Sequence, residues 1–183
     1  MLEEMWTMCQ HQINNAAYQQ EKMNPVAQHL LDTIEKALPL LRQISDTEAS
    51  AKPRPEKWSK KEILGHLIDS ASNNQQKFVR TMQADGHVDF VGYAQNFWVE
   101  AQHYNQANWL EIIALWENYN RHLAHIIQNV PTEKLENTIS IVGSEPFRLA
   151  FIMADYGEHL KHHLKQILPE AGFTSAFENL YNT

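Results

Sequence analysis

Residues 108–131 read NWLEIIALWENYNRHLAHIIQNVP and carry the most regular hydrophobic pattern in the chain. Apolar side chains recur there every three or four residues, which is the spacing of one buried face of an α-helix. Asn108 is a favourable N-cap, and Pro131 cannot continue a helix. The pattern predicts a helix that begins at Asn108, ends before Pro131 and buries one face, formed by Trp109, Ile112, Ile113, Trp116, Tyr119, Leu123, Ile126 and Val130.

Three other segments show the same periodicity. The first begins at Asn24–Pro25 and ends before the polar stretch 45–56. The second opens at Ser59–Glu62, whose residue types match a capping box, and it stops at Asp85–Gly86. The last runs from about Pro146 to Leu168 and is closed by proline and glycine. Four amphipathic helices with little or no sheet predict an all-α four-helix bundle.

A long connection separates the second and third helices of this bundle. Residues 85–107 show no clear periodicity, and we expect an irregular segment that crosses the bundle or carries function. Residues 138–142 are rich in β-branched side chains and are followed by glycine, which favours a short strand or an extended turn. The aromatic side chains of the long connection must pack somewhere, and they are Phe90, Tyr93, Phe97 and Trp98.

Nothing in the chain marks a boundary between two domains. Its 183 residues fit one domain of ordinary size, and no repeat, low-complexity tract or Gly/Ser linker interrupts them. We assign residues 25–183 to the bundle and residues 1–24 to an N-terminal extension of the same domain. Residues 1–23 give the weakest signal, which is consistent with an extra helix, a dimer contact or a remnant of cloning.

Composition argues against several classes of partner. The net charge is −7 and Lys60–Lys61 is the only basic cluster, so nucleic acid is not an expected partner. No apolar run approaches the roughly 20 residues that span a bilayer, and the first residues lack the basic end of a signal peptide. We therefore expect no membrane partner and a cytoplasmic location. The single cysteine, Cys9, forbids an internal disulfide, in agreement with a reducing compartment.

The chain has ten histidines. The helical spacing indicates which of them lie on polar faces and which lie on apolar stripes. His122 and His125 share a polar face of the third helix, so we expect both on the surface. His159 and His163 interrupt the apolar stripe of the last helix at i, i+4 spacing, so one metal ion can reach both imidazoles. Two hydrogen-bonded core histidines would show the same spacing. His162 points about 100° away and is expected to be a surface or partner residue.

On the second helix, His66 borders the apolar stripe, in line with Ser70, Asn73 and Lys77. Such a polar line is either the rim of the buried face or, in a bundle, the wall of a pocket. The spacing alone does not choose between these two interpretations.

Four phrases of the sequence resemble the DinB superfamily, the YfiT-like metal-dependent hydrolases. Residues 58–71, WSKKEILGHLIDSA, are similar to its second-helix signature, and residues 155–167, DYGEHLKHHLKQI, to its C-terminal signature. The aromatic phrases YAQNFW at 93–98 and WENYN at 116–120 also look like this family. The order and the separation of the two histidine motifs both agree with it.

The resemblance extends over about residues 25–168, and residues 1–23 lie outside it. It implies a DinB-like four-helix bundle that binds nickel or zinc through one histidine of the second helix and two of the fourth. Carried over to this chain, the implied metal ligands are His66, His159 and His163. The family also implies a homodimer, which the aromatic-rich connection favours because one small bundle would bury it incompletely.

A divalent ion bound by three imidazoles keeps at least one coordination position for another ligand. In a metal-dependent hydrolase that position holds a water whose pKa the ion lowers to about 7. In a thiol transferase it holds a low-molecular-weight thiol, since soft sulfur suits zinc and nickel. The partner of either enzyme is a small-molecule substrate. A non-enzymatic metal- or ligand-binding protein is the third interpretation, and a fully protein-coordinated ion would favour it.

Hydrolysis also needs a general base near the bound water. The candidates are Glu100 in the long connection, and Glu158 and Asp69 beside the implied ligands. Each is more often a solvated carboxylate, and no motif assigns a catalytic residue. Cys9 lies outside the resemblance, so a cysteine nucleophile is not supported.

Overall fold

The structure is a computed structural model that describes residues 24–180. Apart from Asn24, the predicted N-terminal extension lies outside the described residues. No helix within residues 24–180 combines the length and the apolar character that crossing a membrane requires.

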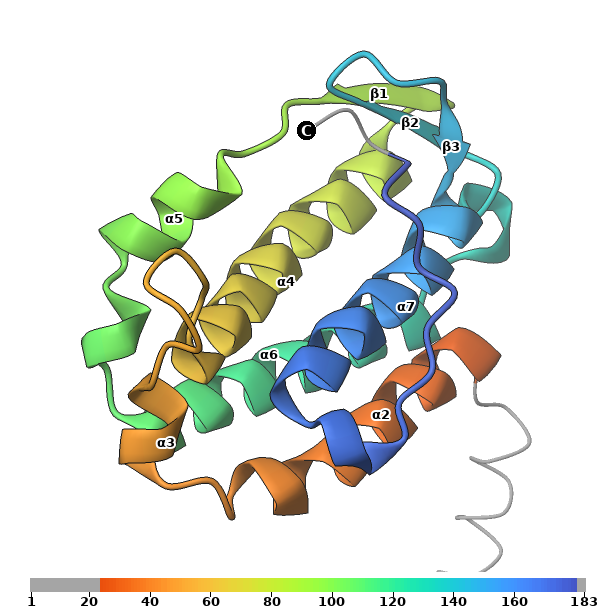
Figure 1. The fold of residues 1–183 in the computed structure, drawn as a ribbon. Helices are drawn as coiled ribbons and strands as arrows, with labels where there is room; N and C mark the ends of the chain where they lie inside the picture. Colours follow the sequence, from red (N-terminus) through yellow and green to blue (C-terminus); the bar gives the residue numbers. More distant parts are fainter. Residues whose placement is uncertain (1–23, 181–183) are drawn as a thin grey trace, which may run out of the picture.

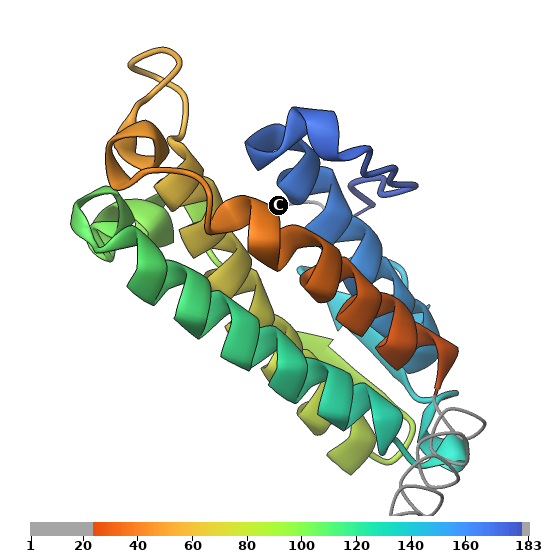
Figure 2. The ribbon, with the colours of Figure 1, turned by 90° about the horizontal axis from the view of Figure 1, so that it is seen from below.

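Four long helices form the body of the molecule (Figure 1). They are α2 (Pro25–Leu41), α4 (Lys60–Gln83), α6 (Trp109–Gln128) and α7 (Leu149–Ile167). Around the bundle they follow the order α2, α6, α4, α7, because α2 and α4 each pack against both α6 and α7. Figure 2 shows the four helices running side by side. The predicted all-α four-helix bundle is confirmed.

The starts of the first three long helices follow their capping residues. The Asn24 side chain accepts a hydrogen bond from the N–H of Val26 at 2.9 Å. Ser59 and Glu62 form the predicted capping box, with bonds of 2.7 and 3.2 Å between the side chain of each and the N–H of the other. Asn108 accepts from two N–H groups in the first turn of α6. These side chains satisfy donors that the first turn of a helix leaves without partners.

The last long helix begins later than the sequence predicted. Phe147–Arg148 forms β3, which pairs antiparallel with β2 (Thr138–Ile141), so α7 begins at Leu149 rather than near Pro146. Pairing with a neighbouring strand occupies backbone groups that a helix would need. The strand β2 lies within the segment for which a short strand or extended turn was predicted.

The connection between α4 and α6 was predicted to be irregular, and this prediction is wrong. It contains β1 (His87–Phe90), α5 (Gln95–Ala101) and the short 3₁₀ helix η1 (Tyr104–Gln106). β1 pairs in parallel with β2, with His87 opposite Thr138, and completes a three-stranded sheet. Parallel strands are joined by a long crossover connection, so the periodicity within one segment does not reveal this pairing.

Three shorter helices lie between or after these elements in the part of the chain that the structure describes. α3 (Asp46–Ser50) occupies part of the polar stretch between α2 and α4. The 3₁₀ helices η2 (Thr132–Lys134) and η3 (Pro169–Ala171) follow α6 and α7. The chain then returns along α7 up to residue 180, as Figure 1 shows.

The core lies between the long helices and is built on large side chains. Trp109 and Trp116 of α6, Tyr156 of α7 and Phe78 of α4 are among its largest fully buried residues. The indole N–H of Trp109 donates to the carbonyl of Leu41 at 3.0 Å. This bond fastens the start of α6 to the end of α2, because a buried indole N–H needs a partner.

Gly65 lets the segment after α5 pack directly on α4. A Cβ atom at this position would overlap the ring of Tyr104. With glycine present, Tyr104 is buried and its hydroxyl donates to Asp69 at 2.8 Å. The close approach of Tyr104 thereby covers the face of α4 next to His66.

Gly65→Ala is expected to lower the free energy of unfolding by about 1–3 kcal/mol, because the added methyl group displaces the Tyr104 ring. Gly157→Ala in α7 is the matched control, since the nearest atom to its added Cβ is His29 Cδ2 at 3.7 Å, an ordinary contact. The control is expected to raise the free energy of unfolding by about 0.5–1 kcal/mol, because alanine favours a helix over glycine. Urea denaturation followed by circular dichroism measures both. A Gly65→Ala protein as stable as the control would contradict the overlap.

Candidate metal centre

Three histidines from two helices converge in the structure. His66 comes from α4, and His159 and His163 come from α7. One ring nitrogen of each lies within 4.8 Å of the others. The ring centroids are 4.6 Å apart for His159 and His163, and 4.7 and 5.4 Å from His66 to His163 and His159. We call these three side chains the histidine triad.

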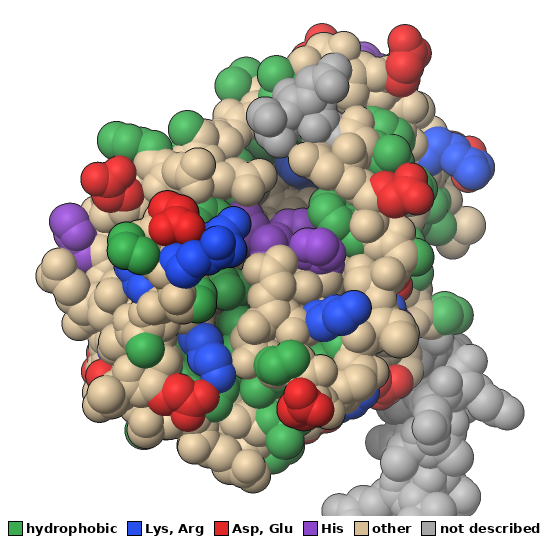
Figure 3. Space-filling view, viewed as in Figure 1, with side chains coloured by type: hydrophobic (Ala, Val, Ile, Leu, Met, Phe, Trp, Pro, Cys, Tyr) green, Lys and Arg blue, Asp and Glu red, His purple; other side chains and the backbone are tan. Residues whose placement is uncertain are grey.

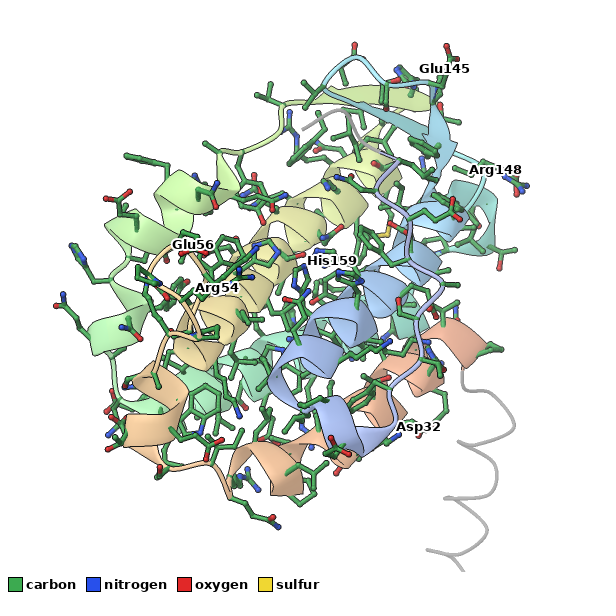
Figure 4. All side chains as sticks on the ribbon, viewed as in Figure 1. Asp32, Arg54, Glu56, Glu145, Arg148 and His159 are labelled. Carbon is green, nitrogen blue, oxygen red and sulfur yellow. The ribbon has the colours of Figure 1, made fainter. Side chains whose placement is uncertain are left out.

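The packing of α4 against α7 creates this arrangement. His159 and His163 are one helical turn apart, so both side chains leave α7 on the same face. In Figure 4, His159 extends from α7 toward α4. His66 is 1% exposed, whereas His159 and His163 are half-buried. The triad therefore has one ligand from the interior and two at its edge.

Burial keeps the triad uncharged at neutral pH. It lowers the pKa of His66 to about 4, because water no longer solvates an imidazolium. Burial, together with the nearby His66 and His162, lowers the pKa of His163 to about 3. The pKa of His159 is also held well below its usual range, by burial first and by His163 second. A neutral imidazole is the form that binds a metal ion.

The triad also has buried nitrogens that no hydrogen bond satisfies. Neither ring nitrogen of His66, nor Nδ1 of His163, has a hydrogen-bond partner among the described residues. Leaving such an atom unpaired costs about 1–3 kcal/mol, so these atoms need an explanation. His159 differs, because its Nδ1 lies 3.4 Å from the hydroxyl of Ser70, a contact that orients the ring. Three neutral imidazoles, two of which carry unpartnered buried nitrogens, fit a divalent metal ion.

Two cavities border the triad, and His163 lines both of them. One of about 370 Å³ is bordered by His159 and His163, and another of about 520 Å³ by His163 and Trp58. Figure 3 shows histidine side chains at the bottom of a hollow in this face of the molecule. Arg54 and Glu56 border the second cavity, in the loop that precedes α4 (Figure 4). Small molecules can therefore reach the triad.

The three carboxylates considered as general bases do not border either cavity. Glu100 is exposed on α5. Glu158 is engaged by Lys161 and by the N–H of Ala176. Asp69 is buried and accepts hydrogen bonds from the Tyr104 hydroxyl and from Gln102, at 2.8 and 2.7 Å. Burial raises the pKa of Asp69 and these two bonds oppose the shift. The structure thus brings none of the three to the triad.

The histidines that were expected on the surface are exposed. His122 and His125 lie on the outer face of α6. His162 is exposed as well, and its ring centroid lies 5.1 Å from that of His163. His162 also borders the smaller cavity.

Two aromatic side chains that sequence reasoning did not select flank the triad. The Trp58 ring lies 5.1 Å from the His66 ring, and the Phe177 ring 4.9 Å from the His159 ring. Trp58 stands directly before the capping residue of α4, which is a signal that could have been used. Phe177 lies beyond the last periodic segment, so nothing in the local pattern indicates its position. Both rings exclude water from the imidazoles that they cover.

Comparison with known proteins identifies the family and the fold of the chain. The family model of the DinB superfamily matches residues 29–167. The chain belongs to the DinB superfamily. Among solved structures, it is similar to YfiT from Bacillus subtilis, described as "a probable metal-dependent hydrolase with an unusual four-helix bundle topology". The TM-score is 0.71 at 16% identity, over 84% of this chain and 90% of YfiT.

A second solved structure shares the fold with a lower TM-score. It is the mycothiol-dependent maleylpyruvate isomerase, with a TM-score of 0.56 and 12% identity, over 86% of this chain and 65% of the isomerase. No curated protein sequence matches the chain. At these identities the two structures establish the DinB-like fold of the chain.

The metal-free protein is expected to lose stability as the pH falls from about 7 toward 4. In the unfolded chain the imidazole of His66 takes up a proton near pH 6.5, whereas burial keeps it neutral in the folded protein down to about pH 4. The unfolded state therefore binds more protons in this window, and His66 alone lowers the free energy of unfolding by about 2–3 kcal/mol across it.

Urea denaturation in the presence of a chelator, at pH 7 and pH 4.5, measures this effect. His66→Phe should reduce the pH dependence, because it removes one of the three imidazoles that burial keeps neutral in the folded protein as the pH falls. His122→Ala, at an exposed position of α6, is the matched control and should keep the slope of the original protein. Equal slopes for His66→Phe and the original protein would show that burial does not suppress protonation of His66.

Proposed function

We propose that the protein is a metal-dependent enzyme in which His66, His159 and His163 hold a divalent ion, nickel or zinc. The observation that carries this proposal is the triad itself, three neutral imidazoles beside two cavities, with unpartnered buried nitrogens on His66 and His163. The membership of the DinB superfamily and the likeness to a structure described as metal-dependent support it. The substrate is a small molecule that enters through a cavity.

The surroundings of the triad favour chemistry over a purely structural metal. A structural zinc ion usually has four protein ligands, whereas a catalytic one keeps a position for water or substrate. Within residues 24–180, only the three histidines form a group whose ligand atoms lie close enough to share an ion. The adjoining cavities leave space for a further ligand. A protein that only stores a metal ion, or uses one to stabilise its fold, would not need a cavity beside the ion for a further ligand.

Hydrolysis is the first reaction that we propose. A bound divalent ion supplies a Lewis acid that lowers the pKa of a bound water or thiol. Ser70 keeps the His159 ring in its orientation, and Trp58 and Phe177 keep bulk water away from two of the imidazoles. Catalytic ligands held in this way need little rearrangement during a reaction.

Transfer of a low-molecular-weight thiol is the second candidate, and two observations favour it. No carboxylate among the three candidates stands beside the triad to take a proton from water, and a thiol is acidic enough to need less help. The cavities on the two sides of His163 also provide room for two substrates. The similar fold of a mycothiol-dependent isomerase is consistent with such a reaction. A homodimer and a cytoplasmic location remain predictions.

His66→Ala, His159→Ala and His163→Ala should each abolish stoichiometric metal binding. We expect each to weaken affinity by more than the roughly 10–100-fold that loss of a hydrogen bond to a ligand costs. His122→Ala and His125→Ala are matched controls that should keep the metal. Metal analysis after gel filtration, with circular dichroism as a folding check, measures the effect.

His162→Ala is the discriminating variant of this series. Its side chain lies beside His163 in sequence but is exposed, so the variant should keep most of the metal. If His162→Ala lost the metal while His163→Ala kept it, the proposed ligand set would be wrong.

The two reactions differ in what they consume. Metal-loaded protein should be incubated with esters and amides alone, and separately with an electrophile plus a small thiol. A hydrolase forms product without thiol, whereas a transferase forms a thioether only when the thiol is present. His159→Ala should lower either rate by at least about a hundredfold, since the metal position is essential to both. A rate that is equal with metal and with chelator would contradict both reactions.

A further inference from the structure

The smaller cavity has two polar ends, and the triad is only one of them. Its floor is the seam between α4 and α7, which run antiparallel here, with Ser70 beside His159. One helical turn before His159, Asp155 borders the cavity from α7, and Lys77 borders it from α4. The charge of Asp155 acts on Lys77, so the two lie near each other. The proposed reaction accounts for neither of them.

Lys77 is the only lysine or arginine among the described residues that border this cavity, and Asp155 is the only carboxylate. Lys77 is half-buried, and its ammonium lies 5.6 Å from the centre of the Phe90 ring. Burial lowers the pKa of Lys77 to about 8 and the charge of Asp155 opposes this shift, so the ammonium is mostly protonated at neutral pH. A cation at the wall of a cavity costs desolvation energy that a bound anion can offset.

The net charge of the cavity determines whether it favours an anionic or a cationic ligand. The Lys77–Asp155 pair is neutral as a whole, and the triad is neutral without metal. A divalent ion on the triad therefore makes the cavity net positive, although the whole chain carries −7. An anionic ligand fits this cavity better than a cationic one, because the protein walls screen charge less than water does.

We propose that the smaller cavity binds small molecules that carry a carboxylate, with the carboxylate at Lys77 and the reacting group at the histidine triad. This inference rests on the proposed metal site. Lys77 is then the residue that determines specificity for the carboxylate. The negative charge of Asp155 weakens the binding of that carboxylate.

The helix geometry sets the length of such a ligand. A helix rises about 1.5 Å per residue, so Ser70, beside the triad, and Lys77 are about 10 Å apart along α4. The cavity volume of about 370 Å³ lies within the range that holds small-molecule ligands. A ligand with a short chain between its two polar ends would therefore touch both.

The test uses full-length, metal-loaded protein and a series of ω-mercaptocarboxylates of increasing chain length. Each is compared by titration calorimetry with the ω-mercaptoalcohol of the same length, so that the thiol contact is common to both. At the best length, the carboxylate should bind about tenfold more tightly than the alcohol, which is the usual strength of one hydrogen bond to a charged group. Shorter chains, which do not reach Lys77, should show the same preference in the original protein and in Lys77→Met.

Two variants with opposite expectations identify the residues. Lys77→Met keeps the side-chain length and should reduce the preference for the carboxylate to about one, with unchanged metal content. Asp155→Asn removes the competing negative charge and should increase the preference. Lys165→Met is the matched control, because Lys165 is an exposed cation of α7 that does not border the cavity. A carboxylate preference that persists in Lys77→Met, or that is lost in Asp155→Asn, would overturn the proposal.

A second measurement separates this inference from the metal site. In chelator-treated protein, propionate should shift the nuclear magnetic resonance signals of the Lys77 side chain in a saturable way, and those of Lys165 should not move. If wild-type protein holds metal but shows neither a carboxylate preference nor this shift, the inference fails and the proposed function stands. If the protein binds no metal but Lys77 responds to propionate, the proposed function fails and the carboxylate subsite stands.

Discussion

The antiparallel packing of α4 against α7 is the contact on which the site depends. It places His66 beside two histidines of α7 that are one turn apart, and it brings Ser70 within 3.4 Å of His159. The same seam continues to Lys77 and Asp155, so one pair of helices carries the triad and the other polar end of the cavity. A small change in the register of these helices would separate the triad, because all three of its side chains come from α4 and α7.

This seam is polar, whereas most of the buried side chains elsewhere in the bundle are apolar. Large aromatic and aliphatic side chains, among them Trp109, Trp116 and Phe78, supply the burial that stabilises the fold. Against that background, two uncharged and unpartnered nitrogens of His66 are costly. A metal ion would satisfy one of these two nitrogens, so the site lowers folding stability at a position where chemistry can occur.

Segments outside the four long helices shape access to the site. The small sheet and α5 hold the connection between α4 and α6 over one side, where Phe90 and Tyr93 border the smaller cavity. The segment after η3 returns along α7 and packs Phe177 on His159. Gly65 permits Tyr104 to lie directly on α4 and to bind Asp69. Asp69 accepts the bonds from Tyr104 and Gln102 at Oδ1, both from residues outside the triad, and its Oδ2 has no hydrogen-bond partner among the described residues.

Local interactions made much of the fold readable from the sequence. The capping side chains of Asn24, Ser59 and Asn108 and the helical periodicity act within a few residues, so the starts of three helices could be predicted. The spacing of His159 and His163 gave their common face for the same reason, whereas His66 was selected only through the family resemblance. The tertiary structure decided what depends on distant partners. The β1–β2 pairing, the position of Phe177 and the meeting of Lys77 with Asp155 each join residues far apart in the chain, and no local periodicity records such contacts.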